Sequence, residues 1–355
     1  MAIAEPVAPA APPAPARAGS DFAELNRRIS DAGLMKRRPG YYAVRFTIMG
    51  LIFAGSWVAF AVIGNTWFQM LMAVFMAVVS AQVALLGHDL AHRQVFRSRN
   101  ASQRIGFFTG NFANGMGYGW WNDKHNRHHA NPNHEELDPD VQPGVLVWSK
   151  DQAMGQRMAH SVIRFINKYQ AYLFFPLITL EGFNLHVSGV KSVVKPGLKQ
   201  RGTEAALLFL HFALYLTAVF MVLSPGKAVV FILIHKMVWG LYMGSIFAPN
   251  HKGMPTFTGK TELDFLRKQV LTSRNVKGGV VIDLALGGLN YQIEHHLFPG
   301  MPSVNLGKAQ PIVEEFCKEK DIPYHATGLI ESWKEALGEL HRNGEPLRNP
   351  QLSKV

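Results

Sequence analysis

Residues 290–299 read Asn-Tyr-Gln-Ile-Glu-His-His-Leu-Phe-Pro, and we interpret the rest of the chain as a scaffold for this stretch. If the run is helical, Gln292, His295 and His296 stand at positions i, i+3 and i+4, so one amide and two imidazoles project from the same helix face. This is the geometry of side chains that bind a metal together. The stretch therefore predicts a helix that presents a metal-binding face to other parts of the chain.

Two other runs repeat this spacing. His125, His128 and His129 occupy the same relative positions, and His88 and His92 stand one helical turn apart. Neutral imidazole binds iron, zinc, copper and nickel, so the ligand type alone leaves the metal open. One tetrahedral zinc ion needs only three or four ligands, and the chain offers more than that. We therefore expect a dinuclear site, for which the candidate ligands are His88, His92, His125, His128, His129, His251, Gln292, His295 and His296.

Acidic residues adjoin the histidine runs, and we expect them to accept hydrogen bonds from the ligand imidazoles, which would fix the orientation of each ring. The ligand set differs from that of the four-helix di-iron proteins, in which glutamates supply many of the ligands. The residues expected to support the site are Asp89, Asp123, Asp138, Asp140, Glu294 and His186.

The composition is that of a membrane protein. Hydrophobic residues make up 48% of the 355 residues and charged residues only 17%. Four apolar runs, at about 42–63, 67–86, 204–223 and 228–248, are each long enough to cross a bilayer at roughly 1.5 Å per helical residue. The sequence therefore predicts an all-α integral membrane protein with four transmembrane helices and a cytoplasmic helical cap that holds the dinuclear metal site.

Basic residues flank these apolar runs on one side, as at 36–38, 93–104 and 191–201. Positive charge marks the cytoplasmic side, so we expect both termini and the metal site to face the cytoplasm, at the plasma membrane if the source is bacterial. The net charge is +11, and the basic residues lie next to apolar segments. This position favours the lipid bilayer, and not nucleic acid, as the partner. The single cysteine, Cys317, excludes an intrachain disulfide and fits a reducing compartment.

Three regions are expected along the chain. Residues 1–39 read as a disordered leader rich in alanine and proline followed by a basic cytoplasmic segment, residues 40–320 as the membrane domain, and residues 321–355 as a polar tail. Within the membrane domain, residues 105–121 predict a re-entrant or interfacial hairpin. Residues 171–187 contain Pro176 and Glu181, which favours an interfacial helix over a span.

Together these residues resemble a known family. The spacings HxxxH at 88–92, HxxHH at 125–129 and QxxHH at 292–296 are similar to the three histidine boxes of the membrane fatty acid desaturases. The resemblance extends to residues 138–141, 250–253 and 290–302, and covers roughly residues 40–320. It implies a di-iron centre held by the box histidines, with His251 as a further ligand. It places Gln292 at a ligand position that binds iron directly or through water.

The resemblance also implies an activity. Such enzymes use O2 to remove hydrogen from adjacent methylenes of a long-chain acyl group, which leaves a cis double bond and water. In having glutamine in place of the first histidine of the third box, at position 292, the sequence resembles the front-end desaturases. Those enzymes place the new double bond between an existing one and the carboxyl end. Those enzymes often carry a fused haem-binding domain, and residues 1–39 are too short for one. We therefore expect a separate electron donor, either a ferredoxin with its reductase or a free haem protein.

Two other functions fit parts of the sequence. An alkane or carotenoid hydroxylase or a sphingolipid desaturase has the same kind of histidine boxes, although Gln292 and the Asp-Pro-Asp-Val segment at 138–141 favour an acyl desaturase. A metal transporter or metal sensor without catalytic activity belongs to a different class. Transport requires ligands near the bilayer midplane, whereas these histidines are predicted at one membrane surface. For the acyl substrate we expect an apolar tunnel between the spans, with the carboxyl head at the basic face.

Overall fold

The computed structural model describes residues 20–349, so the leader predicted for residues 1–19 lies outside it. In chain order the elements are α1 (Ser20–Asp31), α2 (Pro39–Ile63), α3 (Gln69–Ala91), α4 (Arg99–Phe107), the π-helix η1 (Phe108–Ala113), α5 (Tyr118–Ala130), α6 (Lys150–Gly155), the 3-10 helix η2 (Gln156–Met158), α7 (Ser161–Ile178), α8 (Glu181–Val194), α9 (Arg201–Val222), α10 (Pro225–His251), α11 (Phe265–Leu271), β1 (Asn275–Lys277), α12 (Val280–Leu286), α13 (Gln292–Leu297), α14 (Ser303–Glu319), β2 (Ala326–Gly328), α15 (Leu329–Asn343) and α16 (Glu345–Arg348).

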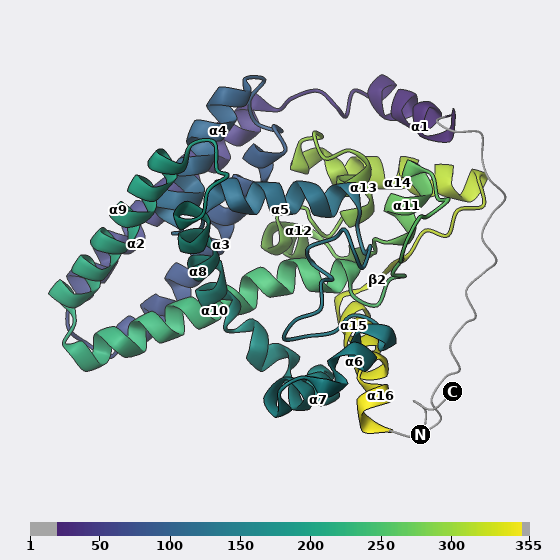
Figure 1. The fold of residues 1–355 in the computed structure, drawn as a ribbon. Helices are drawn as coiled ribbons and strands as arrows, with labels where there is room; N and C mark the ends of the chain where they lie inside the picture. The colour runs from purple at the N-terminus through teal and green to yellow at the C-terminus, as the bar shows by residue number, and fades with distance from the viewer. Residues whose placement is uncertain (1–19, 350–355) are drawn as a thin grey trace.

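Four helices, α2, α3, α9 and α10, are long and apolar enough to cross a membrane, and they fill the left half of Figure 1. They match the four predicted apolar runs, although α3 continues past the expected end at residue 86 to Ala91. The interfacial helix expected at 171–187 is two helices, α7 and α8, bent by 78° to one another. If this bent pair counts as one span, the number of spans rises to five.

Burial along the spans shows which of them lies inside the bundle. In α3, 61% of the most apolar window is buried, against 11% in α2 and 22% in α9. Leu51 and Val62 of α2 are mostly exposed, as expected of side chains that face lipid. The most buried span is therefore the one that carries His88 towards the interior of the molecule.

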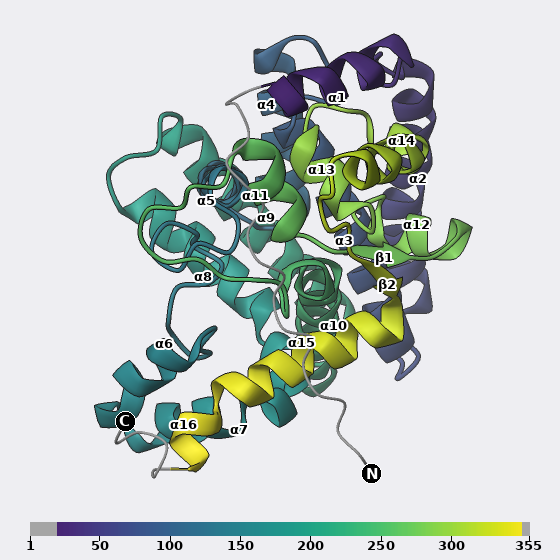
Figure 2. The same cartoon turned by 90° about the vertical axis from the view of Figure 1, so that its right-hand side faces the viewer.

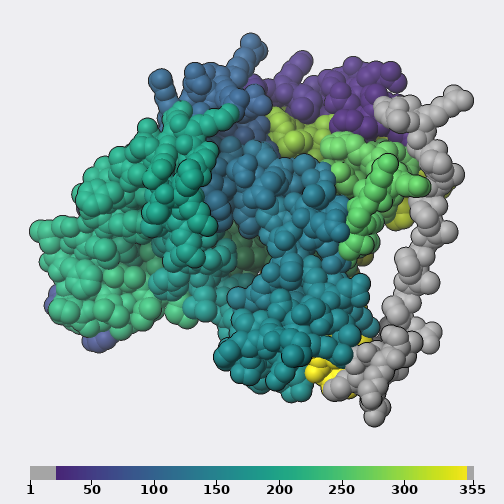
Figure 3. All heavy atoms as spheres, in the orientation of Figure 1, coloured from purple at the N-terminus to yellow at the C-terminus, as the bar shows by residue number. Residues whose placement is uncertain are grey.

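On the side opposite the spans, α1, α11, α13 and α14 share one hydrophobic core (Figure 1). Leu25 and Ile29 of α1 are fully buried in it, beside Ile293 of α13. Arg28 also pairs with Glu319 at the end of α14. The helix at 20–31, in the predicted basic segment, is thus packed into the domain. In the space-filling view the blue segment around residues 100–140 lies between the spans and these helices (Figure 3).

Residues 321–349, which were expected to form a polar tail, are also built into the domain. β2 pairs in parallel with β1, with Asn275 opposite Ala326, so the fold contains one short sheet among its helices. After this pairing α15 crosses the end of α10 and packs on α7 (Figure 2). Buried Arg274 pairs with Glu335 of α15, which links the two segments through a charged contact as well.

Candidate metal centre

Histidine runs that lie far apart in the sequence meet at one end of the membrane helices. His88 and His92 lie at the end of α3, the second run lies on α5, the third on α13, and His251 is the last residue of α10. Helix α5 begins after the extended residue Gly117 and runs without a break to Ala130. Its histidines at positions i, i+3 and i+4 therefore project towards the same interior.

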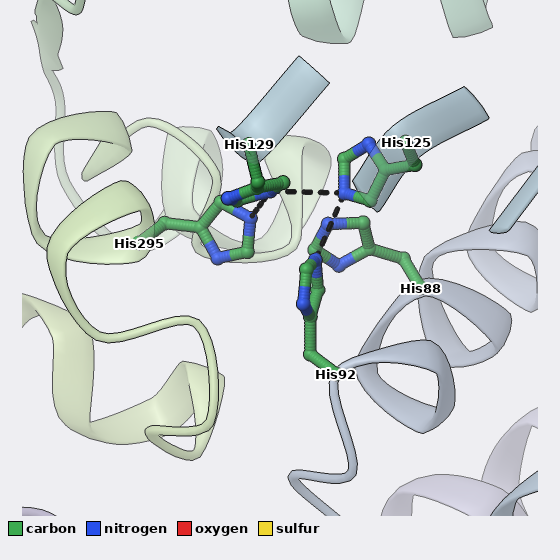
Figure 4. A group of neighbouring side chains, drawn as sticks. All are labelled: His88, His92, His125, His129 and His295. Atoms are coloured by element: carbon green, nitrogen blue, oxygen red, sulfur yellow. Dashed lines mark hydrogen bonds between the residues drawn. The ribbon is translucent and has the colours of Figure 1, made fainter. Parts of the chain in front are cut away.

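The first histidine group consists of His88, His92, His125, His129 and His295, each of which offers a ring nitrogen within 4.8 Å of all the others. Figure 4 shows the five rings gathered around a common centre. The Nε2 atom of His125 lies 2.8 Å from that of His92 and 3.1 Å from that of His129, which lies 3.1 Å from that of His295. Neighbouring nitrogens at right angles around an ion roughly 2.1 Å away are about 3 Å apart, so these separations fit a metal.

The second histidine group consists of His128, His251 and His296, whose ring nitrogens again lie within 4.8 Å of one another. The Nε2 atoms of His128 and His251 are 3.3 Å apart. Gln292 borders this group, with its amide nitrogen 2.9 Å from Nε2 of His251. All four side chains are buried. The candidate ligands therefore form two adjacent groups, as a dinuclear site requires.

Several ring nitrogens in these groups have no hydrogen-bond partner within the described residues, among them both nitrogens of His88 and Nε2 of His296. Leaving such a group unsatisfied in the interior is costly, and a bound ion would satisfy it. Burial lowers the pKa of His129 and of His295 well below the ordinary value, and neighbouring histidines lower it further. The imidazoles are thus held in the neutral form that binds metals, so both groups fit a pair of metal ions.

The ring of His128 is oriented by Asp138. Its Nδ1 atom lies 2.9 Å from the buried carboxylate, which also accepts a hydrogen bond from the backbone N–H of Asn133. A proton on Nδ1 leaves the lone pair of Nε2 directed at His251. Here the supporting role predicted for Asp138 matches the geometry.

The other two rings of the second histidine group are oriented in the same way. Nδ1 of His251 donates to the backbone oxygen of Thr272 at 3.0 Å, and Nδ1 of His296 donates to Oε1 of Gln269 at 2.8 Å. In each ring Nε2 is therefore the atom left for a ligand. The sequence did not single out Gln269 or Thr272, because neither lies at a regular spacing from a histidine. Only their contacts in the folded chain reveal them.

Asp89 supports the first histidine group less directly. Its carboxylate lies 3.6 Å from Nδ1 of His88, which is too long for a hydrogen bond. Instead it accepts hydrogen bonds from Arg45 at 3.0 Å and from Ser303 at 2.9 Å. Asp89 thus ties the end of α3 to α2 and α14, and places a buried negative charge near His88.

The prediction for Asp123 is wrong. Its side chain is 72% exposed and pairs with Arg127, one turn further along α5. At about 100° per residue, position 123 points away from the face that carries the histidines. An acidic residue close in sequence to a ligand is therefore not necessarily close to the site.

Two other predicted supporting residues, Asp140 and Glu294, do not contact the rings as expected. Asp140 pairs with Lys124 at 2.5 Å and stays 3.6 Å from Nδ1 of His128. Glu294 is fully buried but bonds to Asn275 and Tyr324, and burial raises its pKa to about 7. Glu294 directly precedes His295 in the chain. Asp140 is linked to His128 through Asp138, which accepts a hydrogen bond from the Asp140 backbone.

His186 lies elsewhere, so its predicted supporting role is also wrong. Its Nδ1 atom donates to the backbone oxygen of Gly115, and its ring lies 5.3 Å from that of Trp239. Its ring lies next to His211 and Trp239, which together with Lys236 line a cavity of about 430 Å³.

A cavity of about 250 Å³ opens beside both histidine groups. His125, His128 and His251 line it, so a molecule inside would lie next to both candidate metal positions. Most of its remaining wall is apolar and comes from α5, α7, α8 and α10, including Trp121, Phe174, Leu185, Met243 and Phe247. The cavity is therefore suited to an apolar chain that approaches the metals from the membrane helices.

The chain is similar to a known protein family and to several characterised proteins. The model of the fatty acid desaturase family matches residues 65–328. The chain is 33% identical over 350 residues to an acyl-lipid (9-3)-desaturase of Physcomitrium patens, an alignment that covers 90% of this chain and 64% of that protein. It is 29% identical to the Delta(6)-fatty-acid desaturase fat-3 of Caenorhabditis elegans, over 92% of this chain and 75% of that one.

A Delta(8)-fatty-acid desaturase of Euglena gracilis is also 29% identical, over 86% of this chain and 74% of that protein. The family match extends over most of the chain and includes all of the histidines in the two groups. The resemblance seen in the sequence is confirmed: the chain belongs to the fatty acid desaturase family.

Proposed function

We propose that this protein is an O2-dependent desaturase of long-chain fatty acyl groups, with a di-iron centre held by its two histidine groups. The observation that carries the proposal is the convergence of buried, neutral imidazole nitrogens beside an apolar cavity. The names of the relatives support the same reaction class. The ligands in this proposal are His88, His92, His125, His129 and His295 for one iron, and His128, His251 and His296 for the other.

When bound, the two irons supply the activation of dioxygen that removal of hydrogen from an unactivated methylene requires. The residues of the two histidine groups would hold the metals and exclude water from them. Asp138, Thr272 and Gln269 keep three of the rings in the tautomer whose Nε2 atom binds. The apolar wall of the cavity holds the acyl chain against the rings, which fixes the methylenes that react.

For Gln292 we propose a role as hydrogen-bond donor and not as iron ligand. Its Oε1 atom accepts from Nδ2 of Asn250 at 3.1 Å, while Nδ2 of Asn250 also lies within reach of the backbone oxygens of Ile246 and Leu289. These carbonyls fix the orientation of the Asn250 amide, which in turn fixes that of Gln292. The amide N–H of Gln292 therefore points at the second histidine group, 2.9 Å from Nε2 of His251, where it could donate a hydrogen bond to a water molecule.

The arrangement in the membrane is part of the proposal. His88 and His251 lie at the ends of α3 and α10 that are remote from the short connections 64–68 and 223–224. The metals would therefore lie at one surface of the bilayer, which argues against a transporter, whose ligands belong near the midplane. The basic residues on the same side support a cytoplasmic site, at the plasma membrane if the source is bacterial. A separate donor, a ferredoxin with its reductase or a free haem protein, would supply electrons.

Lipid analysis tests the proposed function. The full chain is expressed in a host that lacks such enzymes, and its fatty acids are compared by mass spectrometry with those of a host that expresses His128→Ala. A new double bond near the carboxyl end, absent with the variant, supports the proposal and its front-end form. A new hydroxyl group instead identifies a hydroxylase, a modified long-chain base identifies a sphingolipid desaturase, and no change in lipids together with one bound zinc favours a metal sensor.

A further inference from the structure

The segment between β1 and α13 exposes apolar side chains that no part of the described chain covers. Residues 278–288 read Gly-Gly-Val-Val-Ile-Asp-Leu-Ala-Leu-Gly-Gly and form the short helix α12 between two pairs of glycines. Val280, Val281 and Leu284 share one face of this helix and are 84%, 77% and 68% exposed. An exposed apolar face of this kind marks a surface that meets a partner.

Contacts with two of the spans show how deep α12 lies. The side-chain amide of Gln82 on α3 and the hydroxyl of Tyr242 on α10 donate to backbone oxygens at the end of α12, at 3.2 and 2.8 Å. Gln82 precedes His88 by six residues, which is about 9 Å along α3. Tyr242 precedes His251 by nine residues, which is about 14 Å along α10. The end of α12 is therefore deeper among the spans than these histidines, and Figure 1 shows it between the spans and α13.

The carbonyl groups at the end of α12 all have partners, as a bilayer would require. The last four carbonyls of a helix have no partner inside it, and within lipid no water can replace one. The carbonyl of Asp283 accepts from the backbone N–H of Gly288 at 2.9 Å, and that of Leu286 accepts from the N–H of Leu289 at 3.0 Å. The spans supply donors for the two carbonyls between them. This end of the helix is thus suited to surroundings without water.

The neighbours of α12 match the surface of a bilayer. A cavity of about 830 Å³ separates α12 from α2, and its wall includes Val44, Ile48 and Leu284. Val44 and Ile48 are more than half exposed on a candidate span, so the apolar face of α12 continues the lipid-facing surface of α2 (Figure 2). Lys308 lines the same cavity, and Lys277 directly precedes the segment. Basic residues beside an apolar helix face favour anionic lipid head groups.

We propose that residues 278–288 form a re-entrant segment, which enters the leaflet on the side of the metal centre and presents its apolar face to lipid acyl chains. The chain returns through Gly287 and Gly288, whose φ angles are +63° and +85°. A Cβ atom at position 287 would lie only 2.9 Å from the side chain of Leu85 on α3. Glycine therefore permits both the turn and its close packing against the span.

The segment also anchors the helix that carries the third histidine run. Asp283, its single charged residue, accepts hydrogen bonds from the Asn290 amide at 2.8 Å and from the Tyr291 hydroxyl at 3.2 Å. Asn290 and Tyr291 directly precede α13, whose His295 and His296 belong to different histidine groups. Contact of α12 with lipid thus helps to hold α13 in position. This anchoring rests on the proposed metal centre, whereas the position of α12 does not.

Spin labels test the position of α12 in the full chain, in nanodiscs of phosphatidylcholine and phosphatidylglycerol that hold a single chain. Val281→Cys places a label on α12, Leu51→Cys places one on the lipid-facing side of α2, and Leu137→Cys places one on the exposed loop after α5. Native Cys317 is buried, and the parent chain measures any label that it takes up. Power saturation then compares collisions with O2, which concentrates in lipid, and with a water-soluble nickel chelate.

We expect the label at 281 to collide with O2 as often as the label at 51, and severalfold less often with the nickel chelate than the label at 137. Collision with the chelate at 281 as frequent as at 137 overturns the proposal, because α12 then faces water. A label at 281 that is shielded from both reagents also overturns it, since protein would then cover the helix.

Leu284→Asp tests the anchoring role, with Leu137→Asp as the matched control. An acidic side chain is strongly disfavoured among acyl chains, so Leu284→Asp should weaken iron retention against a chelator about tenfold, while the control leaves it unchanged. Leu284→Ser, a milder change, is measured in parallel in case the first variant fails to assemble. Wild-type iron retention in both Leu284 variants overturns the anchoring role. If the wild type itself holds no iron, the proposed metal centre fails, and the spin labels still decide where α12 lies.

Discussion

Asp138 accepts a hydrogen bond from Nδ1 of His128 at 2.9 Å, and this contact leaves Nε2 of the same ring facing Nε2 of His251 at 3.3 Å. The carboxylate is fully buried and also accepts from two backbone N–H groups, those of Asn133 and Asp140. Because its own position is fixed by the loop after α5, it fixes the ring in turn. The second histidine group thus depends on a residue outside it.

The first prediction concerns this contact. Asp138→Asn keeps the size of the side chain but removes the charge that holds the Nδ1 proton, so we expect iron affinity or turnover to fall by about 10-fold to 100-fold. Iron analysis and turnover measurements check the result. Asp123→Asn is the matched control, because Asp123 is exposed and points away from the site. Equal losses in both variants would contradict the assigned role of Asp138.

The second prediction separates the two histidine groups. We expect His295→Ala to lower bound iron from about two to about one per chain, since it removes a nitrogen from the first histidine group only, and to abolish desaturation. Elemental analysis of the purified variant, together with fatty acid profiling, measures both effects. His325→Ala should change neither, because the His325 side chain bonds to Glu335 and belongs to neither histidine group. An active His295→Ala variant would remove His295 from the ligand set.

The third prediction concerns removal of the metal. A chelator should lower the midpoint of thermal unfolding by several degrees, because the buried ring nitrogens lose their partners and the stabilisation that ligand binding gives the folded state disappears. Differential scanning calorimetry before chelation, after it, and after return of ferrous iron measures the effect. In His296→Ala, which lacks a ligand of the second histidine group, the shift should be smaller. A midpoint that is independent of iron in the wild type would argue against a metal in the interior.

The fourth prediction concerns a lysine inside the spans. Lys236 lines the 430 Å³ cavity with its Nζ atom 4.4 Å from the centre of the Tyr215 ring, and no carboxylate within residues 20–349 forms an ion pair with it. An unpaired cation within the bilayer costs roughly 2.5–3.5 kcal/mol at a helix centre, of which the contact with the ring recovers only part. Lys236→Met should therefore raise the unfolding midpoint by a few degrees.

The control for this experiment is Lys227→Met, at the start of α10, where the lysine bonds to the backbone oxygen of Asn65. That change should leave the midpoint nearly unaltered, since the charge is exposed. If Lys236→Met instead lowers the midpoint, Lys236 contributes an interaction with lipid or with substrate that exceeds its cost of burial.

The fifth prediction tests whether α1 is part of the domain. Leu25 is fully buried among residues of α11, α13 and α14, so Leu25→Ala should lower the free energy of unfolding by about 2–5 kcal/mol. Asn26→Ala, on the exposed face of the same helix, serves as control and should change it by less than about 0.5 kcal/mol. Chemical denaturation in detergent measures both values. Equal stability of the two variants would mean that α1 is not docked in solution.

The sequence by itself determined the membrane class, the four long apolar helices and the residues that gather at the site. These features are local: a run of apolar residues defines a span, and spacing of three and four residues puts Gln292, His295 and His296 on one face whatever the rest of the chain does. The family resemblance added the chemistry that local spacing leaves open. No local pattern, however, says which helices meet.

Only the tertiary structure decided how the candidate ligands divide between the two histidine groups. His128 lies between His125 and His129 on α5, yet it joins His251 and His296 in the second histidine group, because a difference of about 100° per residue sends neighbouring rings to different partners. The same rotation of about 100° per residue places Asp123 on the solvent side of α5. Gln269 contacts His296 from α11, and no regular spacing in the sequence links these two residues. Helix periodicity fixes the direction of a side chain, but the packing of other helices against it fixes what it meets.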